Sequence, residues 1–201
     1  DVIPDKKHHR KIAIGVDLAI SERESADYTA MVSGILCGYG KDAKVYILPN
    51  PVNERLDFPT ARERVKKLSL SLGGGRSVHV YIEDVAYQRA FPQALREERI
   101  NAEAVQIHGT DKHARLTLTT PDMQMERILF PMKGAERLIE QLLGFGVEKH
   151  DDLVDALTIL ILKFQEIINR PRPSITVFSV GPDPQWKTLS SWNGNRRGLS
   201  G

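Results

Sequence analysis

The sequence has few of the features that would define its class at once. Only one cysteine, Cys37, occurs in 201 residues, which excludes an intramolecular disulfide framework and a zinc site built from several cysteines. We therefore expect a reducing, intracellular setting. The longest apolar run, LTILILKF, is too short to span a bilayer. The polar start DVIPDKKHHRK lacks the apolar segment of a signal peptide, so we expect no membrane partner.

Net charge and phosphate-binding motifs give no direct indication of function either. A net charge of +2 is too small to indicate a polyanionic partner by itself. The phosphate loops GxGxxG and GxxxxGK[ST] are absent, because GGGR at residues 73–76 lacks their spacing and context. No nucleophilic triad is suggested by the sequence. The carboxylates are therefore the main candidates for chemistry.

The order of predicted elements favours an α/β fold. Strand patterns, rich in β-branched residues, occupy residues 11–20, 28–40, 44–50, 77–84 and 102–109. Helical spacing occupies residues 58–72, 86–100, 112–119, 134–146 and about 151–168. The first three strands have short connections, which indicates an antiparallel meander. Alternating helices and strands then suit a central mixed sheet of five or more strands, with helices on both faces.

Acidic residues stand at the ends of three of these predicted elements. They are Asp17 in the strand IAIGVDLAI, Glu83 after the strand VHVYI, and Asp151, Asp152 and Asp155 at the start of the last helix. At 100° per residue, Asp151 and Asp155 lie about 40° apart around the helix axis, and Asp152 and Asp155 about 60°. Each group alone can be explained structurally, as a turn residue, a strand end or a helix cap. A structural explanation of the whole set must be invoked three separate times, so the combination favours a functional site.

A divalent cation would make this acidic set favourable. Like charges repel when they are close on a helix, although the first turn of a helix favours anions. Magnesium binds carboxylate oxygens, and two such ions about 4 Å apart can activate a water and stabilise the leaving oxygen in phosphodiester cleavage. The acidic residues therefore predict a two-metal site for phosphodiester chemistry.

Basic residues offer candidate contacts for a nucleic acid. Lys112 and Arg115 of the segment GTDKHAR fall in one predicted helical turn after a strand, where ligands of open α/β sheets gather. Phosphate contacts there would give salt-sensitive binding with little sequence preference. A second helix carries Arg89, Arg96 and Arg99, and a solvated face is the favoured interpretation of that set.

Two histidines differ in their context. His79 alternates with Val78 and Val80 on a predicted strand, which favours a structural role. His150 adjoins the acidic helix start, where a ligand and a plain loop residue are equally good interpretations.

Five motifs, in order, resemble the C-terminal nuclease domain of phage terminase large subunits, proteins that package viral DNA and cut it. They are VDLA (16–19), ADYTA (26–30), IEDVAYQ (82–88), TDKHAR (110–115) and HDDLVDAL (150–157). The resemblance implies a ribonuclease H-like fold and a DNA endonuclease with little sequence specificity. It also implies two Mg²⁺ or Mn²⁺ ions at the active site.

The resemblance also assigns the site residues. Asp17 and Glu83 match the acidic strand residues, as metal ligands and catalytic groups. The DxxDAL part is also similar to the end of Holliday-junction resolvases of the same superfamily, whose last two acidic residues stand three apart. That spacing favours Asp152 and Asp155, and Asp151 stays a third candidate ligand. We expect DNA contacts from Lys112, Arg115, Gln88 and Lys149.

The resemblance further implies a division of the chain and a set of partners. Residues 1–10 would be a linker from a missing N-terminal ATPase domain, 11–168 the nuclease domain, and 169–201 a tail rich in Pro, Gly and Ser. Without a phosphate loop, DNA translocation is not expected. Expected partners are double-stranded DNA and, in a full-length protein, the ATPase motor domain, the portal protein and the small terminase subunit. The domain alone is expected to be a monomer in the host cell cytoplasm.

Two other functions stay open. An actin-like ATPase or sugar kinase also begins with a strand of the form IGxDxG, but Ala19 replaces the glycine that lets a phosphate approach. A DNA-binding module that keeps the fold without catalysis is the second alternative, and the retained acidic set argues against it.

Overall fold

The computed structural model describes residues 3–19, 28–84, 90–106, 112–146, 151–170, 176–177 and 187–188. The chain divides into two compact units, Asp1–Ile168 and Asn169–Gly201. In the second unit, β8 (Thr176–Val177) pairs antiparallel with β9 (Lys187–Thr188). None of the helices in the described ranges has the length and apolarity that crossing a membrane requires.

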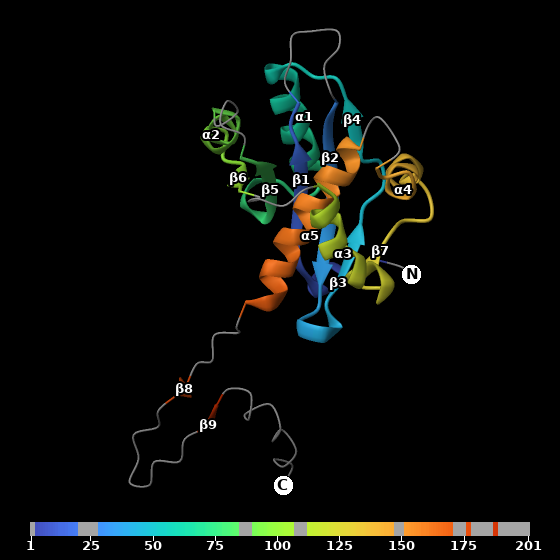
Figure 1. Ribbon diagram of the computed structural model, residues 1–201. Helices are drawn as coiled ribbons and strands as arrows, with labels where there is room; N and C mark the ends of the chain where they lie inside the picture. Colours follow the sequence, from blue (N-terminus) through green and yellow to red (C-terminus); the bar gives the residue numbers. More distant parts are fainter. Residues whose placement is uncertain are drawn as a thin grey trace. The chain divides into compact units, whose positions relative to one another are not determined.

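A seven-stranded mixed sheet forms the centre of the first unit (Figure 1). Its order is β6-β5-β1-β2-β3-β7, and β4 pairs with β2 off this path. The strands are β1 (His9–Asp17), β2 (Thr29–Cys37), β3 (Lys44–Ile47), β4 (Val52–Glu54), β5 (Val78–Glu83), β6 (Asn101–Val105) and β7 (Ile128–Leu129). The pairs β1–β2 and β2–β3 are antiparallel, whereas β1–β5, β5–β6 and β3–β7 are parallel. The predicted meander and the mixed sheet are therefore confirmed.

Helices cover both faces of this sheet, as predicted. The helices are α1 (Phe58–Ser71), α2 (Ala90–Glu97), α3 (Lys112–Gln124), α4 (Glu136–Leu143) and α5 (Asp152–Asn169). Alternate residues of the central strands supply two hydrophobic clusters, because successive side chains point to opposite faces. Ala13 and Tyr81 pack in the cluster that contains α5, and Ile14 and Val80 pack in the cluster that contains α1 and α2.

Local chemistry fixes the start of α1. The Asp57 carboxylate accepts a hydrogen bond from the Thr60 backbone N–H at 2.9 Å, and Pro59 occupies the first turn, where a missing N–H costs nothing. Ala61 and Val65 are then buried at helical spacing against the sheet. The cap at Asp57 therefore fixes where α1 begins, and the spacing of Ala61 and Val65 fixes the face of α1 that packs on the sheet.

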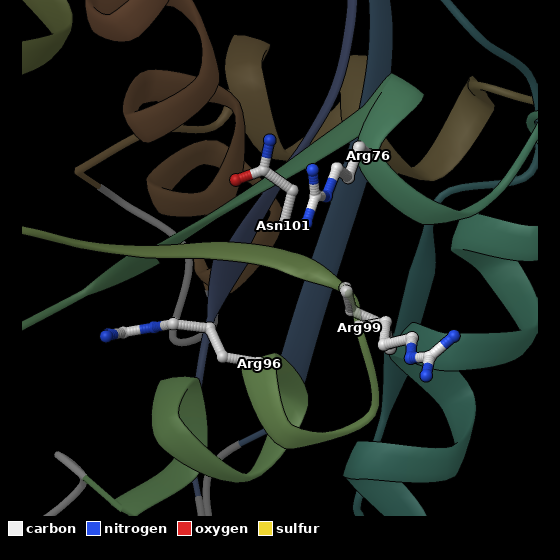
Figure 2. A pocket seen from close by; sticks show the side chains of 5 residues that line it. Arg76, Arg96, Arg99 and Asn101 are labelled. Carbon is white, nitrogen blue, oxygen red and sulfur yellow. The ribbon is translucent and has the colours of Figure 1, made fainter.

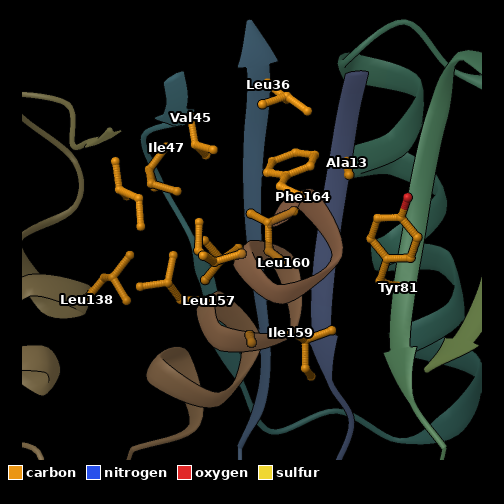
Figure 3. Packing of buried hydrophobic residues seen from close by; sticks show 14 of the residues in the cluster. Ala13, Leu36, Val45, Ile47, Tyr81, Leu138, Leu157, Ile159, Leu160 and Phe164 are labelled. Carbon is orange, nitrogen blue, oxygen red and sulfur yellow. The ribbon is translucent and has the colours of Figure 1, made fainter. Parts of the chain in front are cut away.

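Glycine at position 15 lets α5 cross directly over β1. A Cβ atom at Gly15 would collide with the carbonyl oxygen of Ala156 and lie 2.9 Å from the Leu160 Cβ. Figure 3 shows Leu160 and Phe164 of α5 over the strands β1 and β2. The backbone of α5 therefore lies on the sheet itself, without intervening side chains at this point.

His79 accepts two hydrogen bonds on the face of the sheet that α5 covers. Its Nε2 lies 2.7 Å from the Lys11 Nζ and 2.8 Å from the Asn101 Nδ2. Both partners are donors, so Nε2 accepts and the ring proton resides on Nδ1. Burial, and secondly the Lys11 charge, lower the pKa of His79 below its usual 6.5. The structural role predicted for His79 agrees with these contacts.

Acidification is expected to destabilise the protein through His79. Its pKa is lower in the folded state, so the unfolded chain binds more protons once the pH falls below 6.5. The stability that neutral His79 contributes is complete above that pH and is lost as the pH falls toward the folded pKa. Thermal unfolding measured against pH should show this loss in the wild type, and a smaller loss in His79→Gln. Equal pH dependence in both proteins would contradict the assignment.

Candidate metal centre

Asp17 and Glu83 lie side by side at the carboxyl ends of two neighbouring parallel strands. Val16 pairs with Ile82 in the register of β1 and β5, and each carboxylate follows directly. Asp17 continues the alternation of Ala13, and Glu83 that of Tyr81, both on the face that carries α5. Asp17 and Glu83 are both half-buried. The sheet therefore presents two neighbouring carboxylates toward one helix.

The neighbouring Asp84 is placed differently. By alternation it points to the opposite face of β5, and its Oδ2 accepts a hydrogen bond from the Gln106 Nε2 at 3.0 Å. The structure thus separates Glu83 from Asp84, which the sequence places together.

Helix α5 begins with two buried carboxylates. Asp152 is 8% exposed and Asp155 is 7% exposed, both in the first turn. Asp151 directly precedes the helix, and its carbonyl oxygen accepts hydrogen bonds from the Val154 and Asp155 backbone N–H groups at 2.8 and 3.1 Å. Burying a carboxylate costs free energy unless a charge or hydrogen bonds compensate it. The helix dipole compensates part of that cost.

Helix α5 packs on the sheet with its start toward the end of β1 that carries Asp17. Ala13 of β1 pairs with Gly34 of β2. Gly34 in turn faces Leu160 and Phe164 of α5. Two residues further along β1, Gly15 faces Ala156 and Leu160. One helical turn of about 5.4 Å nearly matches two strand residues of about 6.6 Å. The first turn of α5, which carries Asp152, therefore lies toward the same end of the sheet as Asp17.

A buried glutamine holds the first turn of α5. The Leu153 backbone N–H donates to the Oε1 of Gln141 in α4 at 3.0 Å, and Gln141 is 4% exposed. This contact satisfies one of the free N–H groups of the helix start. It comes from another helix, so the spacing of the sequence gives no signal for it.

Gln141→Ala is expected to loosen the start of α5. The lost acceptor leaves a buried N–H without its partner, which should lower the free energy of unfolding by about 1–3 kcal/mol. Because Gln141 positions the helix that carries Asp152, metal affinity should fall by about 10–100-fold. Urea unfolding and Mn²⁺ titration check both effects. The control Gln93→Ala removes an exposed glutamine bonded to Glu97 at 3.4 Å and should change neither.

The structure brings the acidic residues to one end and one face, in two groups. Asp17 and Glu83 come together on the sheet, and Asp152 and Asp155 on the helix. Within the described ranges, no group of three or more His, Cys, Asp and Glu side chains could hold a metal ion as placed. His150 lies outside these ranges. The oxygen donors match Mg²⁺ or Mn²⁺ in chemistry, and side-chain rotations would be needed to close the two groups around an ion.

The predicted DNA-contact residues are only partly described. Gln88 and Lys149 lie outside the described residues. Lys112 and Arg115 belong to the first turn of α3, and the described part of that segment is its backbone. All four therefore stay predictions.

Two arginines beside the candidate centre were not found from the sequence. The guanidinium carbon of Arg55 lies 4.8 Å, and that of Arg137 5.5 Å, from the ring centre of Tyr28. Tyr28 directly precedes β2, whose Ala30 pairs with Asp17. The three residues come from separate segments, so no motif joins them. They add positive charge at the carboxylate end of β1.

The described architecture is the ribonuclease H-like α/β fold, with a mixed sheet, helices on both faces and acidic residues at the ends of neighbouring parallel strands. No protein-family model matches the chain, and no curated protein matches it. Solved structures do match it over most of their length.

These solved structures are nuclease domains of phage large terminases. The large terminase nuclease of thermophilic phage G20c with bound magnesium is 18% identical, with 79% of this chain and 82% of that chain covered and a TM-score of 0.57. The same nuclease with bound zinc is 20% identical over 77% of this chain and 81% of that chain, with a TM-score of 0.56. The P22 large terminase nuclease domain is 13% identical over 85% of this chain and 90% of that chain, with a TM-score of 0.58. The resemblance predicted from the motifs is confirmed at the level of the fold.

Proposed function

We propose that this chain is the nuclease domain of a phage large terminase, a metal-dependent endonuclease that cuts concatemeric double-stranded DNA with little sequence specificity. The observation that supports this most is the placement of Asp17 and Glu83, at the end and on the face of the sheet where α5 begins with buried Asp152 and Asp155. The fold shared with the large terminase nucleases of G20c and P22 supports it independently.

In this proposal four carboxylates hold two Mg²⁺ or Mn²⁺ ions. Asp17 and Glu83 on the sheet and Asp152 and Asp155 on the helix would hold the ions, with Asp17 shared between them and Asp151 as a third candidate on the helix. When bound, the ions supply Lewis acidity for phosphodiester hydrolysis. The G20c structures with bound magnesium, zinc and cobalt support divalent cations as the cofactor class.

The protein's own part is to fix the carboxylates and to hold the DNA. The Gly15 contact fixes α5 against β1, so the distance between the two carboxylate groups is set by packed backbone. Bound cations would offset the cost of burying Asp152 and Asp155. Lys112, Arg115, Gln88 and Lys149 would bind the DNA backbone, which positions the duplex without reading its sequence.

The proposed setting is the host cell cytoplasm during viral genome packaging. Its partners there would be the ATPase motor domain, the portal protein and the small terminase subunit. The isolated domain would be a monomer.

Cleavage of supercoiled plasmid tests the proposed function. Purified protein should produce linear DNA with Mg²⁺ or Mn²⁺ and none with EDTA. A second digestion with a restriction enzyme should give a smear, because the cut has little sequence preference. Tight DNA binding without cutting under any divalent cation would favour the catalytically silent module. ATP hydrolysis by the purified chain would favour the actin-like ATPase.

A further inference from the structure

A pocket lined by arginines lies at the edge of the sheet, away from the carboxylates. Its volume is about 710 Å³, and its lining residues are Arg76, Arg96, Arg99, Ile100 and Asn101. Figure 2 shows the Arg76 guanidinium beside the Asn101 side chain, whereas Arg96 and Arg99 extend in opposite directions. The pocket joins the turn before β5 to the turn between α2 and β6, because His79 of β5 pairs with Asn101 of β6.

The positive charge of this pocket is not neutralised by the described part of the protein. Arg76, Arg96 and Arg99 form no side-chain hydrogen bond or ion pair with any residue in the described ranges. Two acids adjoin these arginines in sequence. Glu98 is bound by Arg62 at 3.1 Å and Lys66 at 2.7 Å, and Glu97 accepts a hydrogen bond from the Gln93 Nε2 at 3.4 Å.

A further acid, Glu103, is also engaged elsewhere. Glu103 of β6 accepts from the Lys163 Nζ at 2.9 Å, and Lys163 also binds Glu166 at 2.7 Å. Burial has the largest single effect and lowers the pKa of Lys163, but the hydrogen bonds and charges of Glu166 and Glu103 together outweigh it, so the net pKa is raised. Lys163 therefore stays charged and binds Glu103, so within the described ranges no acid pairs with the three arginines of the pocket.

Arginine is the side chain best suited to phosphate oxygens. Its planar guanidinium offers paired donors and loses little hydration on binding. Arg99 has a φ of 63°, in the left-handed region where a helix end usually carries glycine or asparagine. A guanidinium is thus held at a position that is conformationally unfavourable for arginine.

The spread of the three guanidinium groups favours an extended polyanion over one small anion. Because Arg96 and Arg99 diverge, they cannot converge on a single phosphate without moving, but they can meet successive phosphates of a strand (Figure 2). Asn101 pairs with His79 and Val105 pairs with Glu83, so the pocket lies four residues along β6 from the candidate centre. At about 3.3 Å per residue this is about 13 Å, or about four base pairs of duplex axis.

We propose that this pocket, defined by Arg76, Arg96, Arg99 and Asn101, holds backbone phosphates of double-stranded DNA about four base pairs from the scissile bond. The edge strand β6 then lies along the duplex, with the carboxylates at one end and the arginines at the other. The distance to the scissile bond rests on the proposed nuclease function, whereas the phosphate contact itself does not. The sequence alone favoured a solvated helix face for Arg96 and Arg99. In this proposal both residues belong to a binding site instead.

Duplex binding without cleavage tests the pocket. Fluorescence anisotropy of a short labelled duplex in EDTA would compare the wild type with the triple variant Arg76→Gln, Arg96→Gln, Arg99→Gln. The matched control removes three exposed lysines elsewhere, as Lys6→Gln, Lys41→Gln, Lys44→Gln. Each lost arginine should weaken binding by about tenfold, because a hydrogen bond to a charged group is lost. The slope of log K against log salt should fall by about two to three units in the triple variant only.

The outcomes separate the pocket from the nuclease site. Loss of duplex binding in the triple variant, with binding kept in the control and thermal unfolding unchanged, supports the pocket even if the wild type cuts no DNA. Duplex binding equal to the wild type overturns the pocket, even if plasmid cleavage depends on Asp17. Loss of binding to ATP or inorganic phosphate, with duplex binding intact, also overturns it, because the site would then serve a small anion.

Discussion

Replacement of Asp17 by asparagine is expected to reduce metal-dependent plasmid cleavage by about a thousandfold. The amide keeps the size of the side chain but removes the charge that would contact both ions. In the proposed mechanism that charge would supply several kcal/mol of transition-state stabilisation, and each 1.36 kcal/mol is a factor of ten in rate. Single-turnover cleavage with Mg²⁺ and with Mn²⁺ measures the loss.

Stability measurements distinguish a metal ligand from a structural aspartate in the same variant. Without metal, Asp17→Asn should still fold, because asparagine has the same size and one of several neighbouring like charges is removed. The rise in Tm that Mn²⁺ produces in the wild type should be lost. Asp42→Asn, in an exposed turn between β2 and β3, is the matched control and should keep both cleavage and the Mn²⁺ response. Cleavage that survives Asp17→Asn would refute the assigned role.

Gly15→Ala is expected to have the largest effect on folding. The new Cβ would collide with backbone of α5 at Ala156 and with the Leu160 Cβ at 2.9 Å, so no side-chain rotation relieves the contact. Such overpacking should lower the free energy of unfolding by about 3 kcal/mol, or Tm by about 6–12 °C for a chain of this size. Cleavage should fall as well, because α5 moves away from the strand that carries Asp17.

Gly34→Ala is the matched comparison for Gly15→Ala, because it adds the same methyl group at a less crowded position under α5. There the new Cβ would meet the end of the Leu160 side chain at 3.1 Å and the Tyr46 carbonyl oxygen at 3.3 Å. A flexible side chain can shift by a few tenths of an ångström, so Gly34→Ala should destabilise less than Gly15→Ala. Thermal and urea unfolding of the two variants give the order. A Gly15→Ala protein as stable as the wild type would mean that α5 does not pack on β1 as described.

Elements with long, regular patterns were predictable from the sequence, and very short or non-local ones were not. The strand around IAIGVDLAI and the helix beginning at Phe58 have clear periodicity, and both were located within a few residues. β4 (Val52–Glu54) was missed because three residues give no period and a proline precedes them. Its pairing with β2 is made only in the folded chain.

The same limit applies to the candidate site. Residue type and position at element ends selected Asp17 and Glu83 as candidates, but the parallel pairing of β1 with β5 that puts them side by side was not predicted. The cap that Gln141 provides could not be inferred, since it depends on how α4 meets α5. The pocket needs the turn that carries Arg76 to lie beside the turn that carries Arg99, and only the pairing of β5 with β6 brings those two turns together.

Anomalous diffraction from crystals soaked in Mn²⁺ tests the central claim most directly. The claim is that the ends of β1 and β5 and the start of α5 together hold divalent cations. We expect two manganese peaks, one within coordination distance of Asp17 and Glu83 and the other of Asp17 and the helix aspartates, with Asp152 and Asp155 favoured over Asp151. Soaked crystals with no manganese at Asp17, or with manganese bound only elsewhere on the protein, would contradict it.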